Sequence, residues 1–388
     1  MPKPFNQLVV ADMRKVYSDK WCVVEKDELP LSVADMDLPI ASEISTALIK
    51  HVRDGTLMYS AKQGIPGLKE VVANRLAVRY GWAIGAEQIQ PLSATVPGLF
   101  LSVSSVTKPG EGVMVQTPVY TPFFEAIEYT GRRIVPVPLS QPGYRVNREA
   151  LEEGWTPEVK ALLVCNPHNP VGRVFTEFEI ETLANFALEK KLWIISDELH
   201  ADLVLDGEHR PLANVSSELA QKTVTLYGPT KAFNFAGLKI SFAITANRKL
   251  SEKMKLRARG SAEAPNTLAQ TAALAAYTKA DPWLINTLNY LRKNRKRIGE
   301  IVAETPDLEW IPPEGTFLAW LDFRKLGLDD PAQNLQELTG LVLERGSRFG
   351  KLGEGRGFAR LNFGTSQPIL DAALDRLQDA TAIIRKQV

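Results

Sequence analysis

Short strands that are apolar on both faces alternate with amphipathic helices through the middle of this 388-residue chain, and that alternation constrains the fold more than any other feature. A strand without a polar face must be covered on both sides, which is typical of mostly parallel sheets. The chain therefore predicts an α/β fold in which helices flank a mostly parallel sheet. The strand patterns occupy residues 112–118, 159–167, 192–198, 223–227 and 239–246.

Local signals mark the helices between these strands. One helical pattern begins after Pro66 and ends at Gly81. Thr176 and Glu179 form a capping box ahead of an apolar stripe, so a second helix begins there. Residues 93–106, "SATVPGLFLSVSSV", start with small hydroxyl residues and continue as an apolar helix.

The last third of the chain has a different pattern. Residues 255–310 are helical and rich in Lys and Arg, and "YLRKNRKR" at 290–297 reads as the solvated face of one long helix. Two strand patterns, at 314–323 and 357–366, follow in a helix-containing tail. This arrangement indicates a second, smaller α+β domain.

The expected division of the chain follows from these patterns. Residues 51–284 form the large domain and residues 285–388 the small one. Residues 1–50 are an N-terminal segment that contributes to the small domain. Its first 45 residues read as irregular, with an extended stretch at 28–40.

Charge and composition disfavour several functional classes. The 46 Lys and Arg residues balance 45 Asp and Glu, for a net charge of +1, and no dense basic run suggests nucleic-acid binding. Two distant cysteines and four scattered histidines predict neither a disulfide framework nor a metal site. The start lacks a leader-like apolar core and no apolar stretch approaches 18 residues, so we expect no membrane role and a cytoplasmic protein.

Three strand ends carry the polar residues that suggest chemistry. In an open α/β sheet, ligands bind beyond the carboxyl ends of the strands. These ends are "NPHNPVG" at 166–172, residues 197–200, and residues 228–231. Each also has a purely structural explanation: two Asn-Pro turns, a buried ion pair of Asp197, or an exposed loop lysine at 231.

Taken together, a carboxylate, an amide and a lysine at one sheet edge match the handles of pyridoxal phosphate. This cofactor needs a lysine for its aldehyde and an acidic partner for its pyridine nitrogen. A nearby carboxylate favours the protonated nitrogen by raising its pKa. Its phosphate needs backbone N–H groups at a helix start, which the helix at 93–106 offers. An ordinary N-capped helix explains that stretch equally well.

Seven motifs, in this order, carry a resemblance to a known family: "LPLSVADMD", "PVYTPF", "CNPHNPVGRV", "SDELHADL", "PTKAFNFAGL", "EGTFLAWLDF" and "FARLNFGTS". The chain resembles fold-type I pyridoxal-phosphate enzymes of the class I/II aminotransferase group, and most closely the bacterial cystathionine β-lyase (C–S lyase, MalY/PatB-type) branch. The resemblance implies a large domain with a mostly parallel seven-stranded sheet flanked by helices, plus a smaller α+β domain.

The resemblance also implies roles for cofactor residues. Lys231 forms the Schiff base and later shuttles protons, and Asp197 pairs with the pyridine nitrogen. Tyr120 stacks on the ring and counts with these two as catalytic. The remaining cofactor-binding residues are Asn169 and His200 near the ring hydroxyl, Ala94, Thr95, Thr230 and Lys239 at the phosphate, and Tyr59 reaching the phosphate of a neighbouring subunit.

For the substrate, the resemblance implies that Arg360 grips the α-carboxylate, helped by Asn169 and by backbone around Ala34. Without the resemblance, Arg360 is also explained as a strand-edge charge, Tyr120 as packing of a turn and Tyr59 as ordinary core.

Two positions depart from the wider group. Lys239 stands where that group has a phosphate-binding arginine, and it supplies charge without the planar fork. Gly228 stands where the wider group often has a serine that bonds the phosphate.

The expected reaction is α,β-elimination on sulfur-containing L-amino acids such as cystathionine, cystine or S-substituted cysteines, giving a thiol, pyruvate and ammonia. We expect a homodimer with active sites at the subunit interface. Two alternatives stay open at this point: an aminotransferase that uses the same residues, and a regulatory or interaction protein that keeps the fold. Which thioether is preferred does not follow from the sequence.

Overall fold

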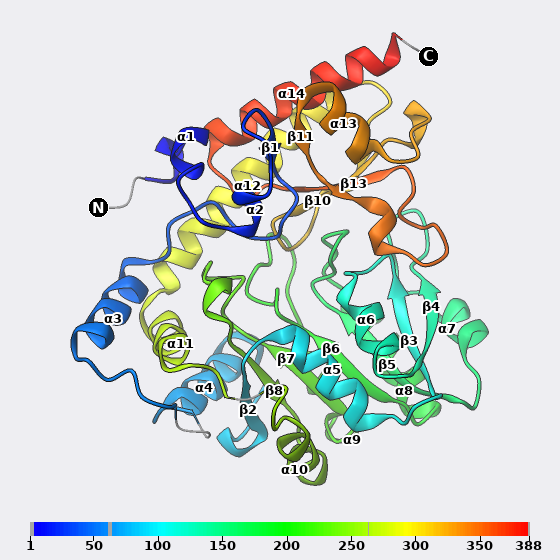
Figure 1. Ribbon diagram of the computed structural model, residues 1–388. Coiled ribbons are helices and arrows are strands. Elements are labelled where there is room, and N and C mark those ends of the chain that lie inside the picture. The colour runs from blue at the N-terminus through cyan, green and yellow to red at the C-terminus, as the bar shows by residue number, and fades with distance from the viewer. Residues whose placement is uncertain (1–3, 61–63, 263, 387–388) are drawn as a thin grey trace.

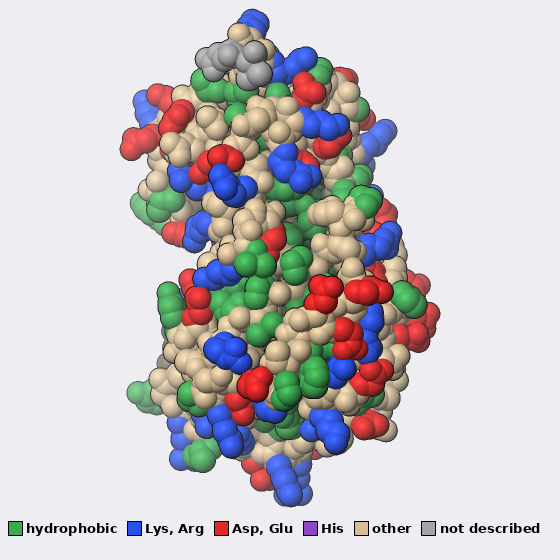
Figure 2. Space-filling model, turned by 90° about the vertical axis from the view of Figure 1, so that its right-hand side faces the viewer, with side chains coloured by type: hydrophobic (Ala, Val, Ile, Leu, Met, Phe, Trp, Pro, Cys, Tyr) green, Lys and Arg blue, Asp and Glu red, His purple; other side chains and the backbone are tan. Residues whose placement is uncertain are grey.

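The protein folds into a large and a small lobe, described by a computed structural model over residues 4–60, 64–262 and 264–386 (Figure 1). In the space-filling view, the molecule narrows between the two lobes (Figure 2). The helices are α1 (Val10–Met13), α2 (Asp19–Cys22), α3 (Ser42–Arg53), α4 (Leu68–Tyr80), α5 (Thr95–Val106), α6 (Pro122–Glu128), α7 (Arg148–Gly154), α8 (Glu177–Glu189), α9 (Ser217–Ala220), α10 (Arg248–Arg257), α11 (Thr267–Lys279), α12 (Asp281–Glu304), α13 (Pro331–Thr339) and α14 (Gln367–Arg385).

The large lobe is built on a seven-stranded sheet with the order β2-β8-β7-β6-β5-β3-β4. Its strands are β2 (Ile89–Leu92), β3 (Gly112–Thr117), β4 (Arg133–Pro138), β5 (Val159–Cys165), β6 (Trp193–Asp197), β7 (Thr223–Tyr227) and β8 (Ser241–Ile244). Neighbours from β7 to β4 run parallel, whereas β8 runs antiparallel to both β7 and β2. The predicted α/β architecture is therefore confirmed, with β8 reversed.

Alternate residues of the strands face two different helical layers, which explains why the strands lack a polar face. Val115 and Leu163 pack in one cluster with residues of α5, α6 and α10. Their chain neighbours Met114 and Leu162 pack in another with residues of α7 and α8. Burial on both sides stabilises each such side chain by about 1.5–3 kcal/mol relative to exposure.

The local helix signals act as predicted at two places. Helix α4 ends at Gly81, whose φ of 62° lies in the left-handed region that glycine tolerates. Helix α8 begins with the capping box, in which Thr176 and Glu179 bond each other's backbone N–H groups.

The prediction that residues 290–297 form a solvated face was only partly right. They lie in the long helix α12, but Leu291 and Asn294 are fully buried. The Asn294 amide donates to the carbonyls of Phe363 (2.9 Å) and Thr365 (2.8 Å). A buried amide NH2 group that donates to two distant carbonyls leaves no signal in the local pattern.

The small lobe contains an antiparallel sheet with the order β12-β13-β10-β9. Its strands are β9 (Glu309–Trp310), β10 (Leu318–Asp322), β12 (Glu344–Arg345) and β13 (Phe358–Asn362). A two-stranded parallel pair joins β1 (Leu29–Pro30) to β11 (Leu341–Val342), so the N-terminal segment is attached to this lobe.

The expectation of an irregular start was wrong in part, because α1, α2, β1 and the beginning of α3 lie within the first 45 residues. Helix α3 continues past residue 50, and α12 crosses residue 284. Both domain boundaries placed from the sequence therefore fall within helices, and the division stays a proposal.

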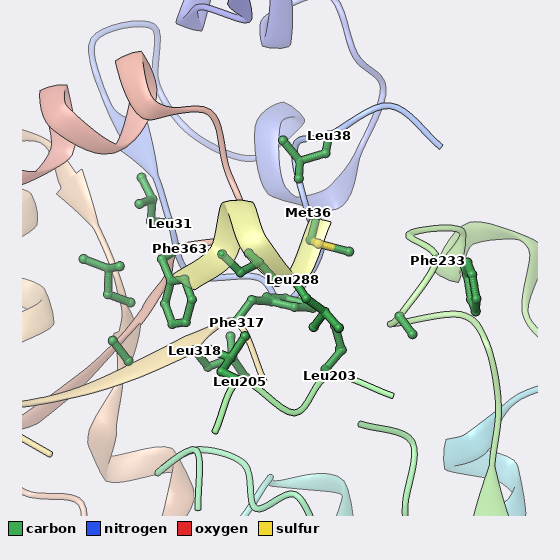
Figure 3. Packing of buried hydrophobic residues seen from close by; sticks show 14 of the residues in the cluster. Leu31, Met36, Leu38, Leu203, Leu205, Phe233, Leu288, Phe317, Leu318 and Phe363 are labelled. Carbon is green, nitrogen blue, oxygen red and sulfur yellow. The ribbon is translucent and has the colours of Figure 1, made fainter. Parts of the chain in front are cut away.

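Residues 31–38 link the two lobes. Leu31, Met36 and Leu38 belong to one buried cluster with Leu203 of the large lobe and Phe363 of the small lobe (Figure 3). The backbone of this linking segment is held from both sides. The Asn362 amide donates to the Asp35 carbonyl at 2.7 Å, and the Asn234 amide to the Met36 carbonyl at 3.0 Å.

Candidate active site

The carboxyl ends of β5, β6 and β7 meet at one edge of the large sheet. Cys165, Asp197 and Leu226 are register partners on these strands. Asn169 and Lys231 lie in the loops that follow β5 and β7. The structure thus brings together the amide, the carboxylate and the lysine that were singled out from the sequence.

Asp197 is a buried carboxylate, and within the described parts of the chain no side chain forms an ion pair with it. Its Oδ1 accepts a hydrogen bond from the Leu199 N–H at 3.1 Å. Burial raises the pKa of Asp197 from the ordinary 3.8 to about 7, against the lowering effect of that N–H group. A cationic group placed beside this buried carboxyl would stabilise its ionised form and lower its pKa.

This raised pKa predicts a pH-dependent stability. The folded chain holds the Asp197 proton more tightly than the unfolded chain, so its contribution is full below about pH 4 and is lost as pH rises through about 7. For cofactor-free protein, the free energy of unfolding of wild type minus that of Asp197→Asn should fall by about 1.4 kcal/mol per pH unit across that window. Urea denaturation at several pH values measures it.

Taking the difference between the two proteins removes the contribution of His200. Burial, together with the charges of Lys231 and Arg360, lowers the pKa of His200 to about 3, so that group alone makes stability fall as pH drops below 6.5. Both proteins retain His200. Parallel stability curves for wild type and Asp197→Asn would contradict the raised pKa.

Lys231 is an amine held against the linking segment. Its Nζ donates to the Ala34 carbonyl at 2.7 Å and lies 3.5 Å from Asp35 Oδ1. Burial lowers the pKa of Lys231, while the Asp35 carboxylate opposes that effect and the Arg360 charge adds to it. The neutral amine, which is the form that attacks a carbonyl or accepts a proton, is therefore more accessible than in an exposed lysine.

Gly228 is explained by a close approach of the backbone. A Cβ at this position would lie 3.2 Å from both the Ile240 carbonyl oxygen and the Ser241 Cα. The turn that begins here leads into Thr230, which is buried, and then into Lys231. A serine at 228 would therefore crowd the strand beside it.

The start of α5 lies at the same sheet edge. Leu92, which ends β2, pairs with Ser241, and Tyr227, which ends β7, pairs with Phe242. Ala94 is the N-cap of α5 and Thr95 its first residue, and neither a side-chain cap nor an acidic residue occupies this first turn. Its free N–H groups and the helix dipole suit an anion.

Arg360 is buried in β13, and its guanidinium reaches the edge of the large sheet. One amino group donates to Asn169 Oδ1 at 3.0 Å and the other to the Ser32 carbonyl at 2.8 Å. Its Nε is buried and has no hydrogen-bond partner in the described structure. Burial lowers the pKa of Arg360 to about 10, and Glu344 opposes that shift. The group stays cationic at neutral pH with a donor left unused.

Two other sequence-predicted residues complete this cluster. Tyr120 lies in the loop after β3, about one-third exposed at 37%, and burial raises its pKa while the Arg360 charge lowers it. His200 is buried and its Nδ1 has no hydrogen-bond partner among the described residues. Its low pKa means that the ring is neutral.

Among the described residues, no hydrogen bond or ion pair joins Tyr59 or Lys239 to this cluster. Tyr59 is fully exposed on the segment before residue 61. It lines a pocket of about 1210 Å³ together with Met58, Arg259 and Thr267. Lys239 is exposed, with a left-handed φ of 58°. Lys239 lies two residues before β8, whose first residue Ser241 pairs with Leu92 at the sheet edge where α5 begins.

The buried carboxylate of Asp202 links the ends of β6 and β7 through hydrogen bonds and ion pairs. Asp202 accepts hydrogen bonds from Tyr80 at 2.7 Å and from Tyr227 at 2.8 Å. Arg75 and Arg79 each lie 3.1 Å from it. Because Asp202 follows β6 and Tyr227 ends β7, this network fixes the two strand ends that carry Asp197 and Lys231 relative to each other.

Sequence reasoning missed three residues near the site. Asp35 faces Lys231, whereas the other acid of "VADMD", Asp37, is buried in an ion pair with Lys20 at 2.6 Å. The motif itself does not tell these two roles apart. Glu344 comes close through the small sheet, and its local sequence gives no sign of this. Asp202 lies five residues after Asp197, but its ion pairs with Arg75 and Arg79 of α4 cannot be seen in the sequence.

The described residues hold no group of three or more His, Cys, Asp or Glu side chains arranged to bind a metal ion. None of the helices that the structure describes is both long enough and apolar enough to span a membrane.

Comparisons with known proteins place the chain among characterised relatives. Residues 26–377 match the family model described as aminotransferase class I and II. The chain is 35% identical to "Cystathionine beta-lyase PatB" of Bacillus subtilis (strain 168), over 91% of this chain and 92% of the relative. It is 30% identical to "Cystathionine beta-lyase" of Corynebacterium glutamicum, over 92% and 95%.

A solved structure extends the comparison to the fold. Cystalysin from Treponema denticola, which contains pyridoxal 5′-phosphate, superposes with a TM-score of 0.93 at 31% identity, covering 99% of this chain and 100% of that one. The predicted sheet and small lobe are thus shared with that protein.

The residues of this cluster fit pyridoxal 5′-phosphate, the cofactor that cystalysin contains. Asp197 has no ion-pair partner among the described residues, and a protonated ring nitrogen would supply one. His200 Nδ1 and Arg360 Nε are buried polar atoms without partners among the residues described. Lys231 offers an amine with a lowered pKa, and α5 offers uncapped N–H groups at the same edge. Each handle of the cofactor therefore has a matching group.

Proposed function

The chain belongs to the aminotransferase class I and II family, and we propose that it acts as a carbon–sulfur β-lyase. The observation that carries the proposal is the identity of 35% to a cystathionine β-lyase over 91% of the chain, in a molecule that brings Lys231, Asp197, Asn169 and Arg360 together. Pyridoxal 5′-phosphate is the cofactor, as in the family. The proposed substrates of the protein are L-amino acids that carry sulfur on Cβ.

Bound cofactor supplies an electron sink for the pair released at the substrate Cα. Lys231 would hold the cofactor, and its Nζ would take the Cα proton and later return it to the departing sulfur. Asp197 would keep the ring nitrogen protonated by its charge. The bond from Cβ to sulfur breaks as the thiol leaves, and water converts the released enamine to pyruvate and ammonia.

Arg360 would bind the substrate α-carboxylate through its unused Nε and a neighbouring amino group. Asn169, already bonded to Arg360, would hold both this group and the ring hydroxyl in place. Orientation decides which Cα bond breaks, because only the bond perpendicular to the ring feeds electrons into it.

A homodimer is part of the proposal. Leu57, Met58 and Tyr59 are apolar side chains that are more than half exposed on one short segment. They lie beside the 1210 Å³ pocket, whose lining includes Lys255 and Arg259. Covering this surface with a second copy would bury the apolar side chains and carry Tyr59 toward the phosphate site of the partner.

A substrate panel tests the reaction. We expect purified holoenzyme to release pyruvate without any oxo-acid, together with a free thiol from cystathionine and S-methylcysteine and a persulfide from cystine. Pyruvate is measured by coupled lactate dehydrogenase and thiol by a chromogenic disulfide. Turnover that requires an oxo-acid acceptor would instead identify an aminotransferase. Absence of turnover under both conditions would contradict both reactions for these substrates.

A further inference from the structure

Three charged side chains run in a line from the buried site to the surface. Glu344 in β12 and Arg360 in β13 face each other across the antiparallel pair, with Glu344 Oε2 3.8 Å from the Arg360 amino group. The other Glu344 oxygen bonds Arg348 at 2.9 Å. The exposed fraction of the side chain rises along the line, from 3% for Arg360 to 18% for Glu344 and 61% for Arg348.

The loop that carries Arg348 is fixed beside Tyr120. The Val119 N–H donates to the Phe349 carbonyl at 2.7 Å, and the Thr121 hydroxyl donates to the Arg348 carbonyl at 2.9 Å. This loop and the start of α6 lie at the boundary between the lobes (Figure 1). The guanidinium of Arg360 packs over the Phe349 ring, 4.9 Å from its centroid. Arg348 therefore lies at the outer end of the same site.

The charges and unused N–H donors of Arg360, Glu344 and Arg348 determine which ligand groups they can bind. Two guanidinium groups and one carboxylate carry a net charge of +1, which the α-carboxylate of an amino acid at Arg360 would balance. A second ligand carboxylate would therefore bind through unused N–H donors of Arg348 and not through an excess of positive charge. Arg348 keeps donors to spare, because one of its five N–H groups suffices for the bond to Glu344. Glu344 fixes the direction of this exposed guanidinium, so less freedom is lost when a ligand binds it.

We propose that Arg348, held by Glu344, is a specificity residue that binds a carboxylate at the far end of the substrate side chain. The inference rests on the proposed function and deepens it. The favoured substrates are then sulfur amino acids whose leaving group carries its own carboxylate, as in cystathionine and cystine. S-alkyl cysteines lack that group and are the poorer class. The two guanidinium groups, linked through one carboxylate, bind the two carboxylates of such a substrate.

A matched pair of ligands tests this binding without any elimination. L-2-aminoadipate and L-norleucine have chains of equal length, and only the first ends in a carboxylate. Their dissociation constants for the holoenzyme are measured by calorimetry and by the change in cofactor absorbance. For Arg348→Ala we expect the aminoadipate constant to rise by about 10-fold, the loss of one charge-assisted contact, and the norleucine constant to stay within about twofold.

Arg345→Ala is the matched control, because Arg345 lies three residues away and pairs with Asp330 at 3.2 Å instead. It should leave both constants unchanged. Arg348→Lys keeps the charge without the fork and should fall between wild type and alanine. Equal changes for both ligands in Arg348→Ala, or no change for aminoadipate, would overturn the proposal.

Kinetics then connect binding to the reaction. The ratio of kcat/KM for cystathionine to that for S-methylcysteine should drop by about 10-fold in Arg348→Ala, in line with the binding change. An unchanged ratio contradicts the role of Arg348 in specificity. If no thioether releases pyruvate from wild type, the lyase proposal fails, while the binding measurements still decide the role of Arg348.

Discussion

Replacing Lys231 by alanine is expected to give a folded protein that holds no cofactor covalently and turns over at least about 1000-fold more slowly. The side chain is mostly buried, its Nζ is fixed by the Ala34 carbonyl, and its pKa is lowered. These features suit an amine that reacts with a carbonyl carbon and moves protons. Lys231 lies in the turn after β7, the last in sequence of the three strands whose ends meet at this edge.

The measurement is direct. Borohydride reduction should add the mass of the cofactor to the wild-type chain and not to Lys231→Ala, and methylamine should restore a small part of the activity. Lys249→Ala, on the exposed side of α10, is the control and should match wild type. A Lys231→Ala protein that still gains the mass and keeps its activity would remove Lys231 from the mechanism.

Local pattern explains what could be predicted of the fold. The strand ends, α4 with Gly81 and the capping box of α8 are encoded within a few residues, so they could be placed from the sequence. The short helices α1 and α2 could not, since each has only four residues and depends on tertiary contacts. Asn294 shows the same limit in a long helix, where its partners lie about 70 residues away.

The site divides in the same way. Asp197 could be singled out because it ends a buried strand, where a carboxylate is unexpected, and Lys231 because it lies in the turn after the next strand. Arg360 drew attention only through the family resemblance, because a strand arginine is common. Glu344 is its cross-strand neighbour, a relation set by the register of β12 on β13. The register between short strands of a small sheet cannot be worked out from one sequence. The contacts that link Arg360, Glu344 and Arg348 therefore could not be predicted.

The charged residues of the site affect one another's pKa values. Asp197 gains from a cation, His200 stays neutral, and the charges of Lys231 and Arg360 help to keep it so. Lys231 is in turn made less basic by burial and by Arg360, and Asp35 limits that effect. Replacing Arg360 should therefore shift the protonation of both Lys231 and His200, so substitutions at these three residues will not be additive.

Replacing Arg360 by alanine is the second change with a large expected effect, a fall in kcat/KM of about 10²–10⁴-fold for every amino-acid substrate. The substitution removes two charge-assisted bonds to the α-carboxylate and leaves Asn169 Oδ1 and the Ser32 carbonyl without their donor. Cofactor absorbance should persist, because Arg360 does not reach Lys231 by any hydrogen bond among the residues described. Steady-state kinetics with cystathionine and S-methylcysteine measures the loss.

Comparing exchange of the Cα proton with elimination separates the effect of Arg360 on substrate binding from its effect on substrate orientation. If Arg360 also sets which bond stands perpendicular to the ring, the variant should exchange the Cα proton with solvent more often per elimination than wild type does. Arg360→Lys keeps the charge without the fork, so it should recover affinity better than it recovers this ratio. Arg356→Ala, an exposed neighbour paired with Asp329 at 2.9 Å, is the control. A kcat/KM within about tenfold of wild type for Arg360→Ala would place the carboxylate site elsewhere.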